Sequence, residues 1–241
     1  MNRENSLGER RAQAGGSWRV KSVIFDWSGV LSNDWDATFL VTNEILGLRG
    51  HPKVTKEEFR ELYELPWMNF YRKIGLSIDV EWEYKEWEKR FPRHGNTIKA
   101  LPQGKECLEW LHKKGIKCVV LSSHNHKLLS DEIEKYGYKE FIHAVRGSSE
   151  DKRNEIESFI VGHEIERNSS LYVGDMCHDI ETARLAGIKS VAVLSGYDKR
   201  EKLEREKPDF IINDVGELPK LVEKLEARKA SAEATAVEGE K

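Results

Sequence analysis

Hydrophobic residues along the chain follow different spacings in successive regions, and these spacings predict different elements. The run "VIFD" (Val23 to Asp26) is short and apolar, as is typical of a buried strand. From residue 35 to about residue 100, apolar and aromatic residues recur at helical spacing, as at Trp67, Phe70 and Tyr71. This region is predicted to be a small helical bundle with an aromatic core.

From Leu101 onward, predicted helices alternate with short apolar strands. The helix "GKECLEWLHKKG" precedes the strand "IKCVVLS", and further strands follow at "FIHAV", "SLYVGD", "SVAVLS" and "DFIIND". Gly115, Gly137, Gly162 and Gly187 stand at the ends of predicted helices, where a left-handed C-cap favours glycine. This alternation predicts an α/β fold: a Rossmann-like, doubly wound parallel sheet with a helical cap inserted after its first strand.

The same change of pattern gives the domain boundaries. We expect the α/β core to comprise residues 19–34 and 101–227, and the helical cap to comprise residues 35–100. Residues 1–18 contain no sustained apolar periodicity and are predicted to be a disordered N-terminal segment. Residues 228–241 lack bulky core residues and are predicted to be a flexible C-terminal tail.

Composition narrows the class of partner and the compartment. The formal net charge of the 241 residues is -3, with acidic and basic residues interspersed, so no nucleic-acid or membrane partner is expected. No apolar run approaches membrane-spanning length, and the N-terminus has no secretory signal. Three scattered cysteines are too few for a disulfide framework. A cytoplasmic protein is therefore expected.

Polar residues stand where the predicted strands end, and the carboxyl ends of parallel strands share one edge of a sheet. They are Asp26, Ser122 and Ser123, Asp175, Asp179 four residues later, and Lys152 at the start of a helix. Carboxylates suit Mg²⁺, and a hydroxyl and helix amides can hold phosphoryl oxygens. The convergence of these groups with an ammonium predicts a site for Mg²⁺ and a phosphate.

Each residue alone has an ordinary explanation. Asp26 could be a helix N-cap, Ser122 a loop hydroxyl and Lys152 a surface residue, but their ordered combination favours a site. The segment "HNH" (His124 to His126) is compatible with substrate contact and with a solvated turn. Cys177 and His178 lie beside Asp175 without metal-ligand spacing, so we regard their position as incidental.

The segments "VIFDWSGVLSND", "VVLSS", Lys152 and "VGDMCHDIETARLAGI" resemble, in order and spacing, the four motifs of the haloacid dehalogenase (HAD) superfamily. The resemblance extends from about residue 20 to residue 226, and "ALPQGKECLEWLHKKGIK" resembles the return from cap to core. The inserted bundle resembles the C1 cap of the phosphoglycolate phosphatase-like branch. The resemblance implies a Mg²⁺-dependent phosphohydrolase that acts on a small phosphorylated metabolite.

The resemblance also implies a role for each motif residue. Asp26 would be the nucleophile that forms an aspartyl-phosphate, and Lys152 would stabilise both the nucleophile and the phosphate. Ser122 and Ser123 would bind the phosphoryl group. The implied Mg²⁺ ligands are Asp26, the backbone carbonyl of Ser28, Asp175 and Asp179.

Ser28 departs from the family pattern. Family phosphatases carry an aspartate two residues after the nucleophile, as general acid and base, and a serine has no titratable proton near neutral pH. Two alternatives therefore accompany the phosphohydrolase reading. The first is a phosphonatase-like C–P hydrolase, which needs a Schiff-base lysine in the cap. The second is a catalytically weak relative that binds a phosphorylated ligand or a partner. The cap offers four candidate lysines, Lys53, Lys56, Lys73 and Lys85.

Overall fold

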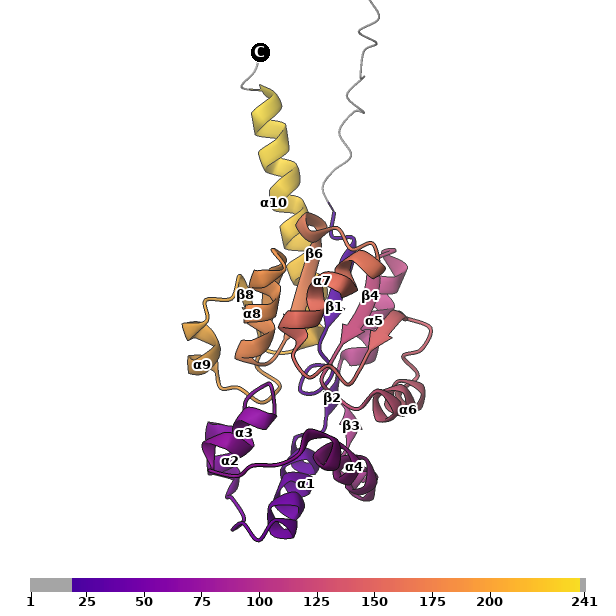
Figure 1. Cartoon of the computed structure of the whole chain (residues 1–241). Coiled ribbons are helices and arrows are strands. Elements are labelled where there is room, and N and C mark those ends of the chain that lie inside the picture. The colour runs from indigo at the N-terminus through magenta and orange to yellow at the C-terminus, as the bar shows by residue number, and fades with distance from the viewer. Residues whose placement is uncertain (1–18, 239–241) are drawn as a thin grey trace, which may run out of the picture.

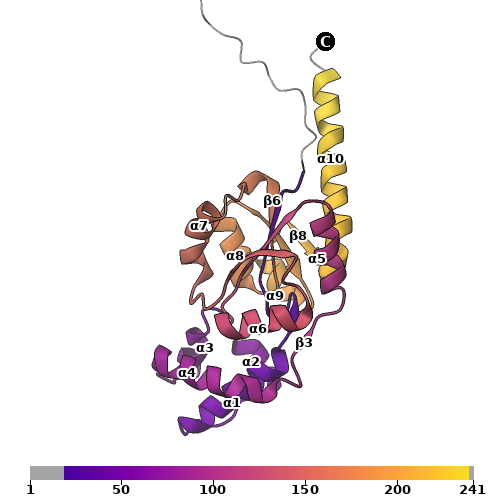
Figure 2. The same ribbon diagram turned by 90° about the vertical axis from the view of Figure 1, so that its right-hand side faces the viewer.

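The computed structural model describes residues 19–238. The N-terminal segment 1–18, for which disorder is predicted, lies outside the described residues. Within the described range the chain forms a sheet-based core with a helical cap at one end (Figure 1). Helix α10 extends from the opposite end of the core, as both ribbon views show (Figure 2).

Six parallel strands form the core sheet, in the order β5-β4-β1-β6-β7-β8. They are β1 (Ser22–Phe25), β4 (Lys117–Leu121), β5 (Ile142–Arg146), β6 (Ser170–Gly174), β7 (Lys189–Val193) and β8 (Phe210–Ile212). All six correspond to apolar runs that the sequence pattern predicts as strands. Strand β1 is central, and both of its faces are buried, which explains why its sequence is continuously apolar rather than alternating.

Helices cover both faces of the sheet. Those packed on the sheet are α5 (Gly104–Lys113), α6 (His126–Tyr136), α7 (Lys152–Gly162), α8 (Cys177–Leu185), α9 (Arg200–Arg205) and α10 (Leu218–Glu238). The helices of the cap are α1 (Trp35–Leu48), α2 (Lys56–Leu62), α3 (Met68–Lys73) and α4 (Val80–Arg90). On one face, Phe25 of β1 belongs to a buried cluster with residues of α5, α6 and α10. On the other face, Ile24 packs with residues of α7 and α8. The predicted doubly wound sheet is confirmed.

The cap consists of helices α1 to α4 and the 3₁₀ turn η1 (Phe91–His94). Phe59, Phe70 and Tyr71 are buried in one cluster with apolar residues of α1, so the cap has the predicted aromatic core. Helix α2 begins with a capping box, in which Thr55 Oγ1 accepts from the Glu58 amide and Glu58 accepts from the Thr55 amide. The same cluster includes Met176 and Tyr197 of the core, so the cap packs directly on the loops at the edge of the sheet.

The two connections between core and cap lie side by side. Strand β2 (Ser32–Asn33) leaves the core and β3 (Lys99–Ala100) returns to it, and the two form a short antiparallel pair. The sequence carries no signal for this pair because each strand has only two residues.

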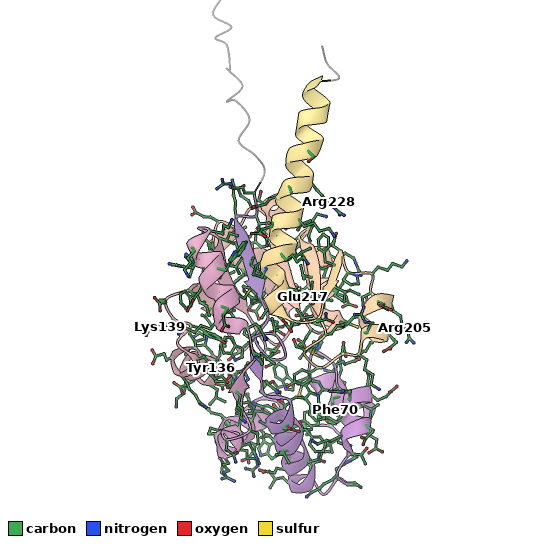
Figure 3. All side chains as sticks on the ribbon, turned by 180° about the vertical axis from the view of Figure 1, so that it is seen from behind. Phe70, Tyr136, Lys139, Arg205, Glu217 and Arg228 are labelled. Carbon is green, nitrogen blue, oxygen red and sulfur yellow. The ribbon has the colours of Figure 1, made fainter. Side chains whose placement is uncertain are left out.

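Two local expectations differ from the structure. Helix α10 continues to Glu238, into the segment 228–241 for which a flexible tail is predicted (Figure 3). The segment is rich in alanine, the strongest helix former, which explains why it continues the helix without core residues. Gly162 is the last residue of α7 and has no positive φ, unlike Gly115, Gly137 and Gly187; Glu164 takes the left-handed conformation instead.

Within residues 19–238, no helix is both long enough and apolar enough to cross a membrane.

Candidate active site

Asp26 follows β1 directly at the carboxyl edge of the sheet. Its side chain is 3% exposed, and its backbone amide continues the sheet by donating to the Val173 carbonyl at 2.9 Å. Its Oδ2 lies 3.0 Å from Lys152 Nζ, while its Oδ1 is buried with no hydrogen-bond partner among the described residues. A buried carboxylate oxygen without a partner is costly unless a ligand completes its bonds. The strand end therefore holds Asp26 ready to receive a ligand.

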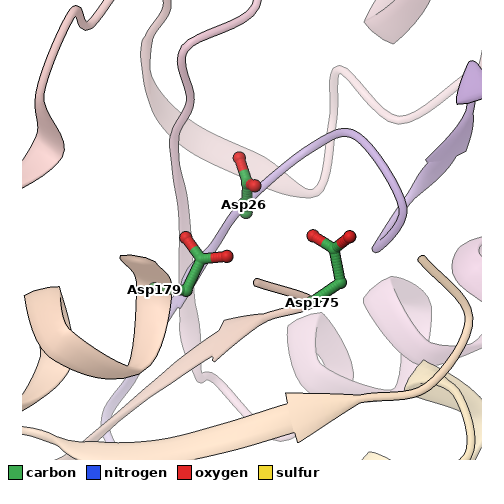
Figure 4. A group of neighbouring side chains, drawn as sticks. All are labelled: Asp26, Asp175 and Asp179. Carbon is green, nitrogen blue, oxygen red and sulfur yellow. The ribbon is translucent and has the colours of Figure 1, made fainter. Parts of the chain in front are cut away.

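Asp175 and Asp179 meet Asp26 at this edge. Figure 4 shows the three carboxylates grouped close together, and one oxygen of each lies within 4.8 Å of the others. Asp175 Oδ2 accepts from the Tyr197 amide at 2.6 Å, and its Oδ1 is buried without a described partner. Burial and the neighbouring carboxylates of Asp26 and Asp179 hold the pKa of Asp175 well above its ordinary value. The described residues therefore do not supply enough positive charge to keep all three groups ionised.

Lys152 is the ammonium predicted for this site. It is 0% exposed, and its Nζ donates to Asp179 Oδ1 at 2.5 Å and lies 3.0 Å from Asp26. Burial lowers the pKa of Lys152, but Asp179 and Asp26 raise it by more, so the amine stays protonated. One ammonium cannot neutralise three buried carboxylates. The unpartnered Oδ1 of Asp175 and the all-oxygen donor set of the three carboxylates fit a hard divalent cation such as Mg²⁺.

Glycines let the backbone approach Asp175 closely. Gly29 has φ +74°, and a Cβ built on it would lie 2.4 Å from Asp175 Oδ2. A Cβ on Gly196 would lie 2.0 Å from the same atom. A side chain at either position would displace the carboxylate, which explains why a glycine stands three residues after Asp26.

Ser122 and Ser123 follow β4 and line the same cavity as Asp26. Ser122 is 1% exposed, and its Oγ accepts from the His124 amide at 3.2 Å. Ser123 Oγ is buried and has no partner among the described residues. Both hydroxyls therefore lie where the sequence predicts a phosphoryl group to bind.

Ser28 is hydrogen-bonded to a carboxylate that the sequence did not single out. Its Oγ donates to Asp34 Oδ2 at 2.5 Å, and Tyr197 donates to Asp34 Oδ1 at 2.9 Å. Asp34 is 1% exposed, and burial raises its pKa to about 6, against the lowering effect of nearby His124. Ser28 and Asp34 both line the cavity, so a carboxyl group does stand near the position where the family has one.

The "HNH" segment is not a solvated turn. His124 is buried, and its Nε2 lies 3.3 Å from Glu132 Oε1. Asn125 is also buried, and its side chain caps α6 by accepting from two amides of the first turn. Only His126 is exposed. His124 and Asn125 both line the cavity, which excludes the solvated-turn alternative for these two residues.

The cavity reaches from the sheet edge into the cap and has an empty volume of about 760 Å³, part of it open to solvent. Its core wall contains Asp26 and the serines described above. Its cap wall is largely aromatic, and its rings belong to Tyr63, Trp67, Phe70, Tyr71, Tyr84 and Trp87. Among the described residues of this cap wall, Glu83 on α4 supplies the single carboxylate.

Cys177 and His178 take no part in the group of three carboxylates. His178 Nε2 pairs with Asp151 Oδ1 at 2.9 Å, and Cys177 is half-buried as a free thiol.

The four cap lysines also lie outside the cavity that holds Asp26. Lys56 and Lys73 pair with surface carboxylates, and Lys53 and Lys85 are exposed.

Comparison with known proteins gives concordant matches. Residues 23–193 match the family model described as "Haloacid dehalogenase-like hydrolase". The chain is 23% identical over 212 residues to a phosphoglycolate phosphatase from Synechococcus elongatus, covering 86% of this chain and 99% of the relative. It is 24% identical over 219 residues to a phosphoglycolate phosphatase from Vibrio parahaemolyticus, covering 84% and 96%.

Solved structures have the same fold. A predicted phosphatase from Clostridium acetobutylicum superposes with a TM-score of 0.77 at 19% identity, covering 86% of this chain and 99% of that one. A hydrolase from Pseudomonas syringae gives a TM-score of 0.73 at 20% identity, covering 85% and 98%.

Proposed function

The chain belongs to the haloacid dehalogenase-like hydrolase family, and on that premise we propose that it is a Mg²⁺-dependent phosphohydrolase acting on a small phosphorylated metabolite. The relatives named phosphoglycolate phosphatases support a phosphatase activity. Sequence identities of 23% and 24% to these relatives support the class of reaction but do not identify the substrate. The nature of the substrate is inferred below from the residues that line the cavity. The three free cysteines suit a reducing compartment, and we place the protein in the cytoplasm.

The environment of Asp26 is the observation that carries the proposal. Lys152 holds one carboxylate oxygen, and the other is buried, unpartnered and part of a residue that lines the cavity. In the proposed reaction this free oxygen attacks phosphorus and forms an aspartyl-phosphate as the bond from phosphorus to the leaving oxygen breaks. The leaving oxygen takes a proton from solvent water. Water then attacks the same phosphorus and loses a proton to solvent, which releases inorganic phosphate and restores the carboxylate.

The remaining residues hold the phosphoryl group. Ser123 has a buried hydroxyl with no described partner, so it can donate to a phosphoryl oxygen without losing another bond. Lys152 brings a fixed positive charge to the point where negative charge gathers during transfer. Ser122 lines the cavity and accepts from the His124 amide, which leaves its hydroxyl hydrogen available to donate to a phosphoryl oxygen.

Asp26, Asp175 and Asp179 are the side chains that would hold Mg²⁺. The resemblance to the family adds the backbone carbonyl of Ser28 to this proposed set. When bound, the ion supplies positive charge that offsets the charge of the carboxylates and of the phosphate. The donor set is entirely oxygen, as this ion prefers.

Asp175→Asn is expected to raise the Mg²⁺ concentration needed for half-maximal activity by at least about 10-fold, because the variant loses a charged ligand. Titration of activity and calorimetric titration with Mg²⁺ measure the change. Asp198→Asn is the matched control. Asp198 is also buried, in the loop that follows β7, but it accepts a hydrogen bond from the Cys177 amide and lies outside the three-carboxylate group. Equal Mg²⁺ affinity in wild type and Asp175→Asn would exclude Asp175 as a ligand.

The cap is placed to act as a lid because the cavity is shared between core and cap and the two connectors lie together. Hydrogen exchange in residues 32–36 and 98–104 is expected to slow when Mg²⁺ and beryllofluoride, a phosphate analogue, are bound. Peptides from β7, an inner strand of the core sheet, provide the internal reference. Unchanged exchange in the connectors, with the analogue demonstrably bound, would mean that the cap does not close on the ligand.

The direct test of the proposed function is phosphate release from a panel of phosphate esters. Sugar phosphates, phosphoglycolate and nucleotides, with and without Mg²⁺, cover the hydrolase reading, and phosphonoacetaldehyde covers C–P cleavage. The phosphonatase alternative has little support, because none of the cap lysines lines the cavity that contains Asp26. The alternative of a binding protein predicts affinity for phosphorylated ligands without Mg²⁺-dependent release from any of them.

A further inference from the structure

We propose that the cap selects phosphate esters whose alcohol carries an organic ammonium group, and that Glu83 is the residue that recognises it. The inference rests on the proposed function, since it concerns the part of the substrate that lies beyond the phosphoryl group. Three features of the cap wall carry it: a buried carboxylate, the rings around it and the absence of cationic side chains among the described residues.

Glu83 is a buried carboxylate whose charge has no partner among the described residues. It is 3% exposed, and its only hydrogen bonds there come from Trp67 Nε1 to Oε2 at 3.1 Å and from the Tyr71 hydroxyl to Oε1 at 3.0 Å. Within residues 19–238 it forms no ion pair. A carboxylate can accept about four bonds, so each oxygen keeps capacity for a ligand. Burial raises the pKa of Glu83 to about 7, which is the expected cost of a carboxylate without a cation.

The rings beside Glu83 suit a cation as well. Six aromatic side chains line the cap wall, and ring faces attract ammonium groups through their quadrupoles. In the described part of the chain, lysine and arginine groups do lie over the rings of Trp35, Phe39, Trp82, Trp110 and Phe210. None of those rings lines the cavity. The aromatic wall around Glu83 therefore has no cation from the described residues over it and is available for one from a ligand.

The charge of the wall also disfavours an anionic alcohol. No lysine or arginine from the described residues lines the cavity, while Asp34 and Glu83 both do. His124 also lines it, but its ring is paired with Glu132. A carboxylate on the substrate, as in phosphoglycolate, would enter an apolar wall whose nearest fixed charge has the same sign. An ammonium group meets an opposite charge and a polarisable surface in the same place. The cavity thus favours a cationic alcohol over a neutral one, and a neutral one over an anionic one.

Three aryl phosphates test this order because they differ only in charge at the far end. They are the phosphate esters of tyramine (an ammonium), of 4-propylphenol (neutral) and of 3-(4-hydroxyphenyl)propionic acid (a carboxylate). Their leaving groups are nearly equivalent, so differences in kcat/KM report recognition. The tyramine ester is expected to exceed the neutral ester by about 10- to 100-fold, and the carboxylate ester to fall below it. Equal values, or a preference for the carboxylate ester, would overturn the inference.

Glu83→Gln then tests the residue. The change is nearly isosteric and removes the charge, and the new amide can still accept from Trp67 while donating to the Tyr71 hydroxyl oxygen. KM for the tyramine ester is therefore expected to rise by about 10-fold or more while kcat/KM for the neutral ester stays unchanged. Glu88→Gln is the matched control on the same helix, because Glu88 is exposed. Glu88→Gln should leave kcat/KM for all three esters unchanged. A uniform loss for all three esters in Glu83→Gln would mean that Glu83 only supports the fold of the cap.

Failure of the proposed function would look different. In that case none of the three esters releases phosphate in the presence of Mg²⁺. Calorimetric binding of the same esters to the Mg²⁺-loaded protein then decides the inference independently. Tighter binding of the tyramine ester supports recognition of ammonium by the cap, and equal affinity for the three refutes it.

Discussion

Asp26→Asn is expected to remove measurable phosphate release from every substrate while leaving the fold intact. The amide oxygen and nitrogen are poor nucleophiles, so the covalent step has no attacking group. Loss of a covalent nucleophile costs on the order of 10⁶-fold in enzymes where this has been dissected. The change is nearly isosteric, and it removes one negative charge from a group in which three carboxylates face a single ammonium. The folded state should therefore tolerate it.

Three measurements check this result. Initial rates with an activated aryl phosphate give the activity, thermal unfolding gives the stability, and intact-protein mass measurement after a brief incubation detects the phosphorylated enzyme. Asp198→Asn, the same isosteric change in a buried carboxylate outside the group, controls for general effects of the substitution. Activity retained in purified Asp26→Asn, or a phosphoryl group found on it, would exclude Asp26 as the nucleophile.

The second prediction concerns the serine at position 28, where phosphatases of the family have an aspartate. With no carboxyl group at this position to protonate a leaving alkoxide, the wild-type protein is expected to hydrolyse aryl and acyl phosphates in preference to alkyl phosphates. General acid–base assistance is typically worth about 10²- to 10⁴-fold, so its absence should be clearest for poor leaving groups. The aspartyl-phosphate should also persist, since the attacking water lacks a base.

Restoring the carboxylate requires a second substitution. Ser28 Oγ lies 2.5 Å from Asp34 Oδ2, so Ser28→Asp alone would bring two buried carboxylates into contact. When Ser28→Asp is combined with Asp34→Asn, the amide introduced at position 34 can donate to the new carboxylate while its oxygen still accepts from Tyr197. This double variant is expected to hydrolyse alkyl phosphates about 10²- to 10⁴-fold faster than Asp34→Asn alone and to lose its phosphoryl group sooner.

Rates on matched alkyl and aryl phosphates, together with single-turnover decay of the phosphoenzyme, measure both effects. If wild type hydrolyses alkyl phosphates as fast as aryl phosphates, another residue supplies the proton. Asp34 would then be the first to examine, because it is bonded to Ser28 and lines the cavity. If the double variant is no faster than Asp34→Asn, position 28 does not control the proton.

The residues that could be predicted from the sequence are those fixed by the ends of strands. Asp26 and Asp175 follow apolar runs directly, and Lys152 and Asp179 begin helices that follow strands. In a parallel sheet these positions must share an edge, so their meeting follows from local pattern and topology alone. The fold class could be predicted for the same reason, because each of the six strands has its own apolar run.

The residues that could not be predicted depend on packing between distant segments. Glu83 stands in "VEWEYKEWEKR", where alternating acidic and basic residues resemble a solvated helix face, and only the position of α4 over the cavity buries it. His124 and Glu132 are buried together because α6 packs beside Trp27, which donates to Glu132 at 2.7 Å. Asp34 looks like a helix cap in the sequence but makes no cap hydrogen bond; it binds Ser28 and Tyr197 instead.

The central position of β1 has a consequence for how the chain reaches its native state during synthesis. Strand β1 is the first of the six core strands to be synthesised, but its two neighbours in the sheet, β4 and β6, are synthesised much later. Ser22 of β1 pairs with Lys117 of β4 on one side and with Ser170 of β6 on the other. Until β6 emerges, one edge of β1 has no native partner, and closing such long loops makes folding slow. The cap is continuous in sequence and contains its own aromatic cluster, so it can become compact before the core does. The nascent chain thus carries an exposed apolar strand edge through much of translation, a stage at which chaperone binding would protect it.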